Sequence, residues 1–275
     1  SVGGGIPIIR PLMSSITGDE IVEISGIVNG TTNYMLTKMT NEGLAFDDVL
    51  KEAQAKGYAE KDPTADVEGY DACRKLAFLT SLVCGQQVNY EDIHTEGITK
   101  ITPTDIMYAK EMGRAIKLLA MSRQTANGYV AMVAPFLIPA DHPLYNVNDV
   151  FNAIFVKGNM LGDAMFYGSG AGKLPTASAV VGDIVDMVKH MHTHIILNWD
   201  AEPVKLADYK TNETRFFVRT KASKEEISRT FGSVEFVDIE ELADEIGFVT
   251  ETMSEAAYEE KAAQLSSVLQ MIRFN

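Results

Sequence analysis

The stretch from residue 19 to residue 85 combines one strand-type segment with three helix-type segments, and each of the three ends at a glycine. Residues 19–28, DEIVEISGIV, are rich in Ile and Val and alternate in polarity, which is typical of a β-strand. The helix-type segments that follow end at Gly43, Gly57 and Gly85, and glycine is the residue type that most often follows a helix. They span residues 29–43, 45–57 and 69–85. This order predicts a sheet with helices packed against it.

The rest of the chain adds strands and then changes its pattern. Strands are expected at 94–98, 115–122 and 128–138 and in two short segments around a Gly158-Asn159 turn, with helices at 104–113 and 173–194. After about residue 200 the order becomes β-α-β-β-α-β, which is typical of a compact module. The sequence therefore predicts an α+β (α/β) fold, in which a mixed β-sheet with helices on one face is followed by a small module of its own at 200–275.

Composition argues against several classes of partner and location. Apolar residues make up 46% and charged residues 23% of the 275 residues, which is the balance of a folded chain. The formal net charge of −14 repels nucleic-acid phosphates and anionic lipids, so neither is expected as a partner. No apolar run approaches the roughly 20 residues of a membrane span, and no signal peptide is visible. With Cys73 and Cys84 as its two cysteines, the chain is expected to contain no disulfide and to be cytoplasmic.

The segment AEKDPTADVEGYDACRK, residues 59–75, places many carboxylates ahead of a lysine. On a helix over 69–85, Asp71, Lys75 and Phe78 fall on one line, which continues to Leu82. A lysine beside apolar neighbours, with an aspartate one turn away, is a candidate proton donor or acceptor. The alternative is an ordinary exposed ion pair worth about 0.3–0.5 kcal/mol.

The acids that precede this helix favour the interpretation as a binding site. One or two carboxylates at this position stabilise the N-terminus of a helix. Glu60, Asp62 and Asp66, together with Asp71, exceed that need. We therefore expect the surplus to bind a cationic group, either a metal ion or the ammonium of a substrate.

Four stretches, in order, resemble the homoserine dehydrogenases. They are GGGIPII (3–9), GIVNGTTNYML (26–36), the run from Ala53 to Lys75, and YGSGAGKLPTASAVVGDIVD (167–186). The resemblance implies an oxidoreductase that interconverts L-homoserine and L-aspartate 4-semialdehyde with NAD(H) or NADP(H), in the biosynthesis of threonine, methionine and isoleucine. It also implies a homodimer formed through the central sheet.

The same resemblance implies roles for individual residues. Lys75 would be the catalytic lysine, which exchanges a proton with the substrate oxygen, and Asp71 would position that lysine or the substrate. Glu60 and Asp66 would hold the ammonium of the substrate. The remaining positions that would match family sites are Tyr58, Gly30 and Thr31 in the substrate pocket, Gly170 and Gly172 near the cofactor, and the backbone carbonyls of Val2 and Gly4 around a structural Na⁺ or K⁺.

The resemblance also divides the chain into parts. Residues 1–18 would cross over from a dinucleotide-binding domain that this sequence lacks, 19–166 would form the catalytic and dimerisation domain, and 167–195 would return toward the missing domain. Residues 200–275 resemble an ACT domain, a regulatory module that often binds amino acids. Because no strand leads into G-x-G-x-x-G and a helix, we expect this chain to be inactive by itself.

Two other functions remain open at this point. Glu60, Asp62 and Asp66 could bind Mg²⁺ in a hydrolase or lyase, although a metal site needs no lysine at its centre. The chain could instead be a non-catalytic dimer that senses amino acids, as its C-terminal module suggests.

Overall fold

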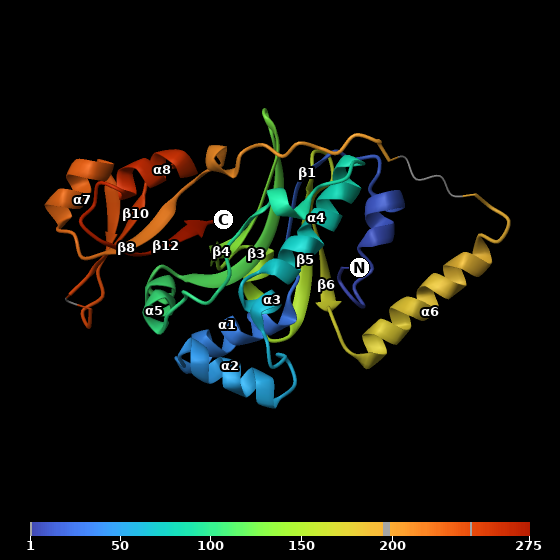
Figure 1. Cartoon of the computed structure of the whole chain (residues 1–275), viewed down its shortest axis with the longest axis horizontal. Coiled ribbons are helices and arrows are strands. Elements are labelled where there is room, and N and C mark those ends of the chain that lie inside the picture. The colour runs from blue at the N-terminus through green and yellow to red at the C-terminus, as the bar shows by residue number, and fades with distance from the viewer. Residues whose placement is uncertain (1, 195–198, 243) are drawn as a thin grey trace.

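The computed structural model describes residues 2–194, 199–242 and 244–275 (Figure 1). Within them, one ten-stranded sheet has the order β6-β5-β1-β3-β4-β12-β8-β10-β9, with the short β2 also paired to β4. Its strands are β1 (Ile21–Ile27), β2 (His94–Thr95), β3 (Arg114–Thr125), β4 (Gly128–Pro139), β5 (Phe151–Gly158), β6 (Gly162–Ser169), β8 (Phe216–Thr220), β9 (Val234–Val237), β10 (Ile246–Thr250) and β12 (Val268–Phe274). A separate two-stranded sheet pairs β7 (Glu213–Thr214) with β11 (Met253–Ser254).

The helices largely follow the predicted segments. They are α1 (Gly30–Glu42), α2 (Phe46–Ala55), α3 (Thr64–Val67), α4 (Tyr70–Cys84), α5 (Pro103–Glu111), α6 (Lys173–Lys189), α7 (Lys224–Phe231) and α8 (Glu255–Ala262), with short 3₁₀ or π turns at Pro11–Ser15, Tyr90–Asp92, Pro143–Asn146 and Tyr209–Thr211. Gly43 and Gly85, which follow α1 and α4, have φ angles of 68° and 67°. Those left-handed conformations explain why glycine ends both helices.

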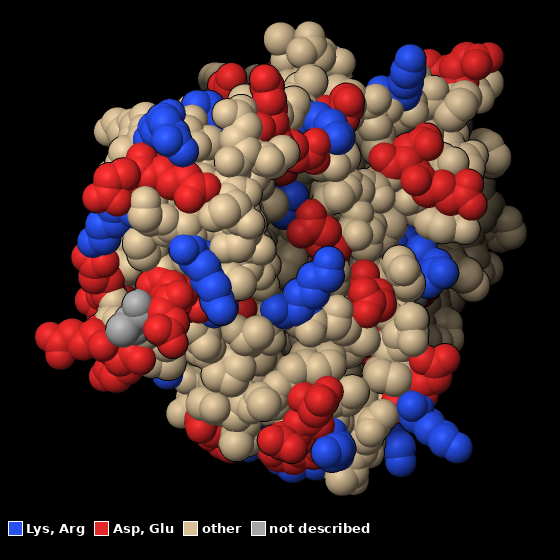
Figure 2. Space-filling view, turned by 60° about the vertical axis from the view of Figure 1, so that its left-hand side comes forward, with Lys and Arg blue, Asp and Glu red and all other residues tan. Residues whose placement is uncertain are grey.

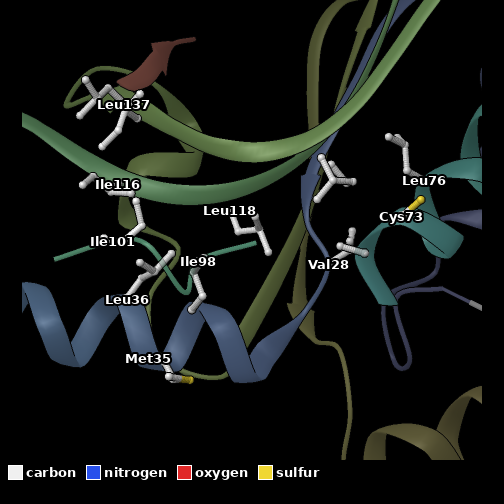
Figure 3. Packing of buried hydrophobic residues seen from close by; sticks show 14 of the residues in the cluster. Val28, Met35, Leu36, Cys73, Leu76, Ile98, Ile101, Ile116, Leu118 and Leu137 are labelled. Carbon is white, nitrogen blue, oxygen red and sulfur yellow. The ribbon is translucent and has the colours of Figure 1, made fainter. Parts of the chain in front are cut away.

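The expected arrangement with helices on one face of the central sheet is confirmed. α1, α4 and α5 all pack on β3, and α4 also packs on β4 (Figure 1). The core between them includes Leu36 of α1, Leu76 of α4 and Leu118 of β3, each at most 5% exposed. Figure 3 shows these side chains converging between α1, α4 and the strands. Burying such apolar surface is the main force that fixes the helices on the sheet.

The predicted β-α-β-β-α-β order of the C-terminal part is confirmed, but its sheet is not separate. Its four strands lie in the order β12-β8-β10-β9, and all neighbours are antiparallel. The last residues of β12 also pair with the central sheet in parallel, Arg273 opposite Phe136 and Phe274 opposite Leu137. Main-chain pairing therefore joins the two parts, which local sequence patterns could not reveal.

Three segments differ from the prediction. Residues 58–68, which lie between two predicted helices and carry no helical pattern, contain α3. The side chain of Asp62 accepts hydrogen bonds from the backbone N–H and the hydroxyl of Thr64, the first residue of this helix. The strand expected at 94–98 is limited to β2, since the backbone after it leaves the sheet and contacts Val67. The N–H of Ile98 donates to the carbonyl oxygen of Val67, and a Cβ on Gly97 would lie 2.0 Å from that oxygen. The helix expected to reach residue 194 ends at Lys189. Residue 195, the last of the predicted 167–195 segment, lies outside the described residues.

Helix α6 lies apart from the sheet (Figure 1), and none of its residues is buried. It carries exposed apolar side chains, among them Leu174, Val181 and Met187, which are 83%, 57% and 68% exposed. Arg10 ties it to the N-terminal segment through ion pairs with Asp183 and Asp186. In the described ranges, no helix has the length and apolarity needed to span a membrane.

The molecular surface carries charges of both signs. In the view of Figure 2, acidic and basic side chains are interspersed and neither sign forms a continuous face. The formal net charge of −14 is therefore distributed and not confined to one patch in this view.

A buried ion network lies where the two parts of the sheet meet. Arg273 of β12, 2% exposed, binds Glu255 at 2.5 Å and Glu96 at 2.8 Å, while His94 lies 2.6 Å from the same Glu96 carboxylate. The ring of His94 stacks on Tyr209 of the connecting segment at 3.8 Å. Burial would raise the pKa of Glu96, but the hydrogen bonds from His94 and Arg273 outweigh burial and lower that pKa to about 2.

Replacing Glu96 by glutamine should weaken this joint and remove part of its acid sensitivity. At pH 7 we expect a loss of about 2 kcal/mol in the free energy of unfolding, since Arg273 loses one charged hydrogen-bond partner. Because the pKa of Glu96 is depressed in the folded state, the wild-type chain loses this contribution as the pH falls from about 4.5 toward 2, and E96Q should lack that loss. Urea denaturation at several pH values measures both effects.

The matched control is Glu235→Gln, which removes a largely exposed carboxylate paired with Arg215. Such surface pairs contribute little, so this variant should unfold as the wild type does. If E96Q and E235Q had the same denaturation profiles from pH 7 to pH 3, the proposed role of Glu96 at the joint would be wrong.

Candidate functional site

The side chain of Asn29 connects three helices at the carboxyl end of β1. As the N-cap of α1, its Oδ1 accepts hydrogen bonds from the backbone N–H of Thr32 at 2.9 Å and from the Thr32 hydroxyl at 3.0 Å. Its Nδ2 donates to Asp66 Oδ1 of α3 at 2.7 Å and to Asp71 Oδ2 of α4 at 2.9 Å. With Asn29 only 6% exposed, all its hydrogen-bonding groups have partners, so the start of α1 holds both acids in place.

Lys75 faces this cluster from the second turn of α4. Its Nζ lies 2.6 Å from Asp71 Oδ2 and donates to the backbone carbonyl of Val28 at 2.9 Å. The side chain is 25% exposed, so it lies at the rim of the structure and not in bulk water. An ammonium has three N–H groups, and the third has no bonding partner among the described residues. It is therefore available to a ligand.

Lys75 and Phe78 lie on one line of α4, as the helical spacing predicts, but Phe78 is not buried. Phe78 is 41% exposed, whereas the neighbouring line of Ala72, Leu76 and Leu79 is buried against the sheet. Helical periodicity groups residues on one face but does not say which face meets the core. The rim position of Lys75 comes instead from its contacts with Val28 and Asp71 at the end of β1.

The other residues expected in the substrate pocket surround the start of α1 to different degrees. The hydroxyl of Thr31 donates to the backbone carbonyl of Tyr58 at 2.7 Å, which joins α1 to the segment after α2. A Cβ at Gly30 would lie 3.0 Å from the carbonyl oxygen of Val150, so glycine fits a close approach there. Glu60 is exposed, and its carboxylate forms no ion pair with the residues that the structure describes. The structure thus gathers Asp66, Asp71 and Lys75 more closely than Glu60.

The acids do not form a metal site. Among the described residues, no group of three or more His, Cys, Asp or Glu side chains could hold a metal ion. Asp62, one of the expected Mg²⁺ ligands, is used to begin α3. What remains at the centre is two carboxylates facing one lysine, a polar cluster with surplus negative charge that attracts a further cation.

The glycine-rich segment GSGAGK, residues 168–173, contains the turn between a strand and a helix. It follows β6 and leads into α6, whose N-cap is Gly172 with a φ angle of 118°. A Cβ at Gly170 would lie 1.7 Å from Asn152 Oδ1, so no side chain fits at this position. On the other side, a Cβ at Gly4 would lie 2.0 Å from the carbonyl oxygen of Gly170. The N-terminal glycines therefore pack against this turn, beside the buried Val2.

Asn29 is the residue of the cluster that sequence reasoning missed. In the sequence it is the first residue of the helix-type segment 29–43 and nothing more. The available signal was its position directly before Gly30 in the stretch that resembles the homoserine dehydrogenases. Its two amide bonds reach residues 37 and 42 positions away, which no local pattern specifies.

Comparison with known proteins gives a consistent picture. The family model described as homoserine dehydrogenase matches residues 7–185. The homoserine dehydrogenase of Synechocystis is 52% identical over 192 residues, which cover 68% of this chain and 44% of that protein. That of Bacillus subtilis is 46% identical over 198 residues, which cover 72% and 46% of the two chains. This chain therefore spans less than half the length of these relatives.

Solved structures of homoserine dehydrogenases superpose on all or about two thirds of this chain. The homoserine dehydrogenase of Thiobacillus denitrificans superposes with a TM-score of 0.88 at 37% identity and covers 100% of this chain and 68% of its own. A hyperthermophilic archaeal homoserine dehydrogenase in complex with NADPH gives a TM-score of 0.59 at 32% identity, covering 68% and 54%. From the family match and these likenesses, the chain belongs to the homoserine dehydrogenase family.

Proposed function

We propose that this chain is the substrate-binding and catalytic part of an enzyme that interconverts L-homoserine and L-aspartate 4-semialdehyde with NAD(H) or NADP(H). The observation that carries the proposal is the arrangement of Lys75 opposite Asp66 and Asp71, with all three fixed around Asn29. A proton-exchanging group and an anionic receptor lie side by side, as an amino alcohol substrate requires. This reaction serves the biosynthesis of threonine, methionine and isoleucine.

The surplus negative charge suits the ammonium group that both substrates carry. Asp66 keeps one carboxylate oxygen free of the Asn29 bond and would accept a hydrogen bond from that ammonium. Glu60 is exposed nearby in the chain and would complete the receptor when substrate is present. Gly30, Thr31 and Tyr58 would form the remaining wall of the pocket, since they meet at the start of α1.

Lys75 would exchange the proton of the substrate oxygen. In the reduction of the aldehyde, the free N–H of Lys75 donates a proton to the oxygen, and in the oxidation of the alcohol that nitrogen takes the proton back. Asp71 contacts the ammonium of Lys75 at 2.6 Å and would hold it in the orientation for this transfer. The carbonyl of Val28 restrains the ammonium from the other side.

The cofactor would approach the turn between β6 and α6. When bound, its nicotinamide ring supplies or accepts the hydride that accompanies the proton. Gly170 and Gly172 leave room for backbone approach, and the first turn of α6 offers the kind of helix N-terminus that binds phosphate groups. Gly4 lies against this turn, and its backbone carbonyl, together with that of Val2, would hold a monovalent cation, Na⁺ or K⁺.

The remaining part of a longer protein would supply the dinucleotide-binding domain. The relatives are more than twice as long as the matched region, and α6 presents apolar side chains that nothing among the described residues covers. Free cysteines Cys73 and Cys84 suit a cytoplasmic enzyme. The C-terminal module, with its strand order β12-β8-β10-β9, would be an ACT-like unit that is joined rigidly to the catalytic part.

We also propose that two copies associate through the sheet face that the helices leave open. On this face Phe151, Met165 and Tyr167 are 37%, 40% and 52% exposed near the edge strand β6. Met165 and Tyr167 lie opposite Phe155 and Ala153, which belong to the core cluster on the side away from the helices. An exposed apolar surface at a sheet edge favours association with a second copy.

Replacing Lys75 by methionine in the full-length protein should abolish most of the activity. Loss of a positioned proton donor typically lowers the rate by about 10²- to 10⁴-fold, and we expect kcat/KM to fall within that range. The control Lys51→Met removes a side chain that is 76% exposed and should leave the rate unchanged. Spectrophotometry of NADPH consumption with L-aspartate 4-semialdehyde measures both variants, and a fully active K75M would contradict the proposal. The 275-residue chain alone should show no turnover.

Replacing Asn29 by aspartate should separate its bridging role from its capping role. Aspartate caps a helix as well as asparagine does, so the cap survives, but a third carboxylate then faces Asp66 and Asp71. We expect a loss of about 2–3 kcal/mol in the free energy of unfolding at pH 7, which shrinks as the pH falls and the carboxylates take up protons. The exposed Asn127→Asp is the control for the change of charge. Equal stability of N29D and N127D in urea denaturation would show that Asn29 does not hold the acids.

Substitution of Met165 by lysine should disrupt the proposed dimer. A charge in the centre of an apolar contact surface is costly to bury, so the full-length M165K protein should sediment as a monomer at concentrations where the wild type is a dimer. Met107 of α5 is also 40% exposed but lies among the helices, and M107K should remain dimeric. A monomeric wild type, or a dimeric M165K, would rule out this surface.

A further inference from the structure

The segment from Val147 to Asn152, here the 147–152 loop, is held by side chains of α1. The Nδ2 atom of Asn33 lies 3.2, 3.0 and 3.1 Å from the carbonyl oxygens of Val147, Asp149 and Phe151. One turn later, the hydroxyl of Thr37 accepts a hydrogen bond from the backbone N–H of Asp149 at 3.0 Å. Asp149 has a φ angle of 56°, in the left-handed region that non-glycine residues seldom adopt. Besides its own backbone hydrogen bond, from the N–H of Phe151 to the carbonyl oxygen of Asn148, the loop is therefore anchored on α1.

A buried lysine holds the same loop from β3. Lys117 is 2% exposed, and its Nζ lies 2.6 Å from the carbonyl oxygen of Val147, 2.9 Å from Asn148 Oδ1 and 3.4 Å from Asn33 Oδ1. These three acceptors match the three N–H groups of an ammonium. Among the described residues no carboxylate pairs with it at ion-pair distance. Burial lowers the pKa of Lys117 to about 8, and the carboxylate of Asp149 opposes that shift only in part.

Such a buried ammonium is expensive for the fold. An apolar side chain of similar length would fill the same space without the loss of hydration. The core therefore does not require a lysine at position 117. The hydrogen bonds of Lys117 all go to the 147–152 loop and to Asn33, which anchors that loop. Lys117 therefore determines the position of the loop.

The end of this loop lies between the substrate pocket and the glycine turn. Asn152, 3% exposed, donates from Nδ2 to the carbonyl oxygen of Ile27 at 2.8 Å, directly before the segment that leads to Asn29. Its Oδ1 is so close to Gly170 that a Cβ built on that glycine would lie only 1.7 Å from this oxygen. The carbonyl oxygen of Val150 closes on Gly30 in the same way, at 3.0 Å from a Cβ built there. The loop thus touches both the start of α1 and the turn before α6.

We propose that Lys117, Asn33 and Thr37 are positioning residues, which fix the 147–152 loop so that Asn152 sets the spacing between the substrate pocket at Gly30 and the turn at Gly170. The inference rests on the proposed function, because that function places the substrate at Gly30 and the cofactor at the turn that contains Gly170. A misplacement of about 1 Å between two reacting groups costs about 10²-fold in rate. Loosening the loop should therefore lower kcat more than it raises KM.

The test uses Lys117→Met and, in case that variant folds poorly, Thr37→Val, which keeps the shape and removes the hydroxyl that holds Asp149. Val218→Ala is the control, because it opens a cavity in the core of the C-terminal module and makes no contact with the loop. Amide hydrogen exchange on the 275-residue chain should show at least about tenfold faster exchange in residues 147–152 for K117M or T37V, and unchanged exchange there for V218A.

Kinetics of the full-length protein give the second measurement. K117M or T37V should lower kcat about 10- to 100-fold with KM changed less than about threefold, whereas V218A should change neither. Exchange in the loop that stays at the wild-type rate, or a kcat equal to that of the wild type, would overturn the proposal. A wild-type protein without homoserine oxidation would refute the proposed function alone, since the exchange result does not depend on activity.

Discussion

The amide group of Asn29 is the interaction on which the candidate site depends. Two carboxylates, those of Asp66 and Asp71, lie within hydrogen-bond distance of one nitrogen atom, and without it their like charges would drive them apart. Because Asn29 also caps α1, the same residue fixes the helix start and the acids at once. Lys75 then completes the cluster by joining Asp71 to the end of β1. The same four side chains, Asn29, Asp66, Asp71 and Lys75, therefore join α1, α3 and α4 and form the candidate site.

The sheet determines where the parts of this site can lie. β1 ends at Ile27, two residues before Asn29. Its neighbour β5 begins at Phe151, directly before Asn152, and β6 ends at the turn that contains Gly170. Because β1 pairs with β5 and β5 with β6, both antiparallel, the end of β1, the start of β5 and the end of β6 lie next to one another at the same end of these strands. Segments more than a hundred residues apart in the sequence therefore share one site. Helix α4 packs on this sheet through the apolar core shown in Figure 3, which includes Cys73 and Leu76, and α3 packs on α1 and α4.

Much of this arrangement could be predicted from local sequence patterns, and the parts that could not be predicted depend on long-range contacts. Glycines after α1 and α4, and the spacing of Asp71 and Lys75, follow from rules that act within one helical turn. The bridging role of Asn29, the pairing of β12 with β4 and the exposure of Phe78 do not, because each depends on which distant segment packs nearby. The acidic run itself could not show that Asp66 joins the cluster while Asp62 starts a helix.

The central claim is that the carboxylates beside Lys75 hold the ammonium of an amino-acid substrate, and ligand binding tests it most directly. Isothermal titration of the full-length protein with L-homoserine should give clear binding. The analogue 4-hydroxybutyrate, which has the hydroxyl but no ammonium, should bind at least about tenfold more weakly, since the carboxylates beside Lys75 would then have no cationic group of the ligand to bind. Asp66→Asn should weaken the binding of L-homoserine and leave the affinity for 4-hydroxybutyrate unchanged. Equal affinity for the two ligands, or no effect of D66N on L-homoserine, would contradict the account.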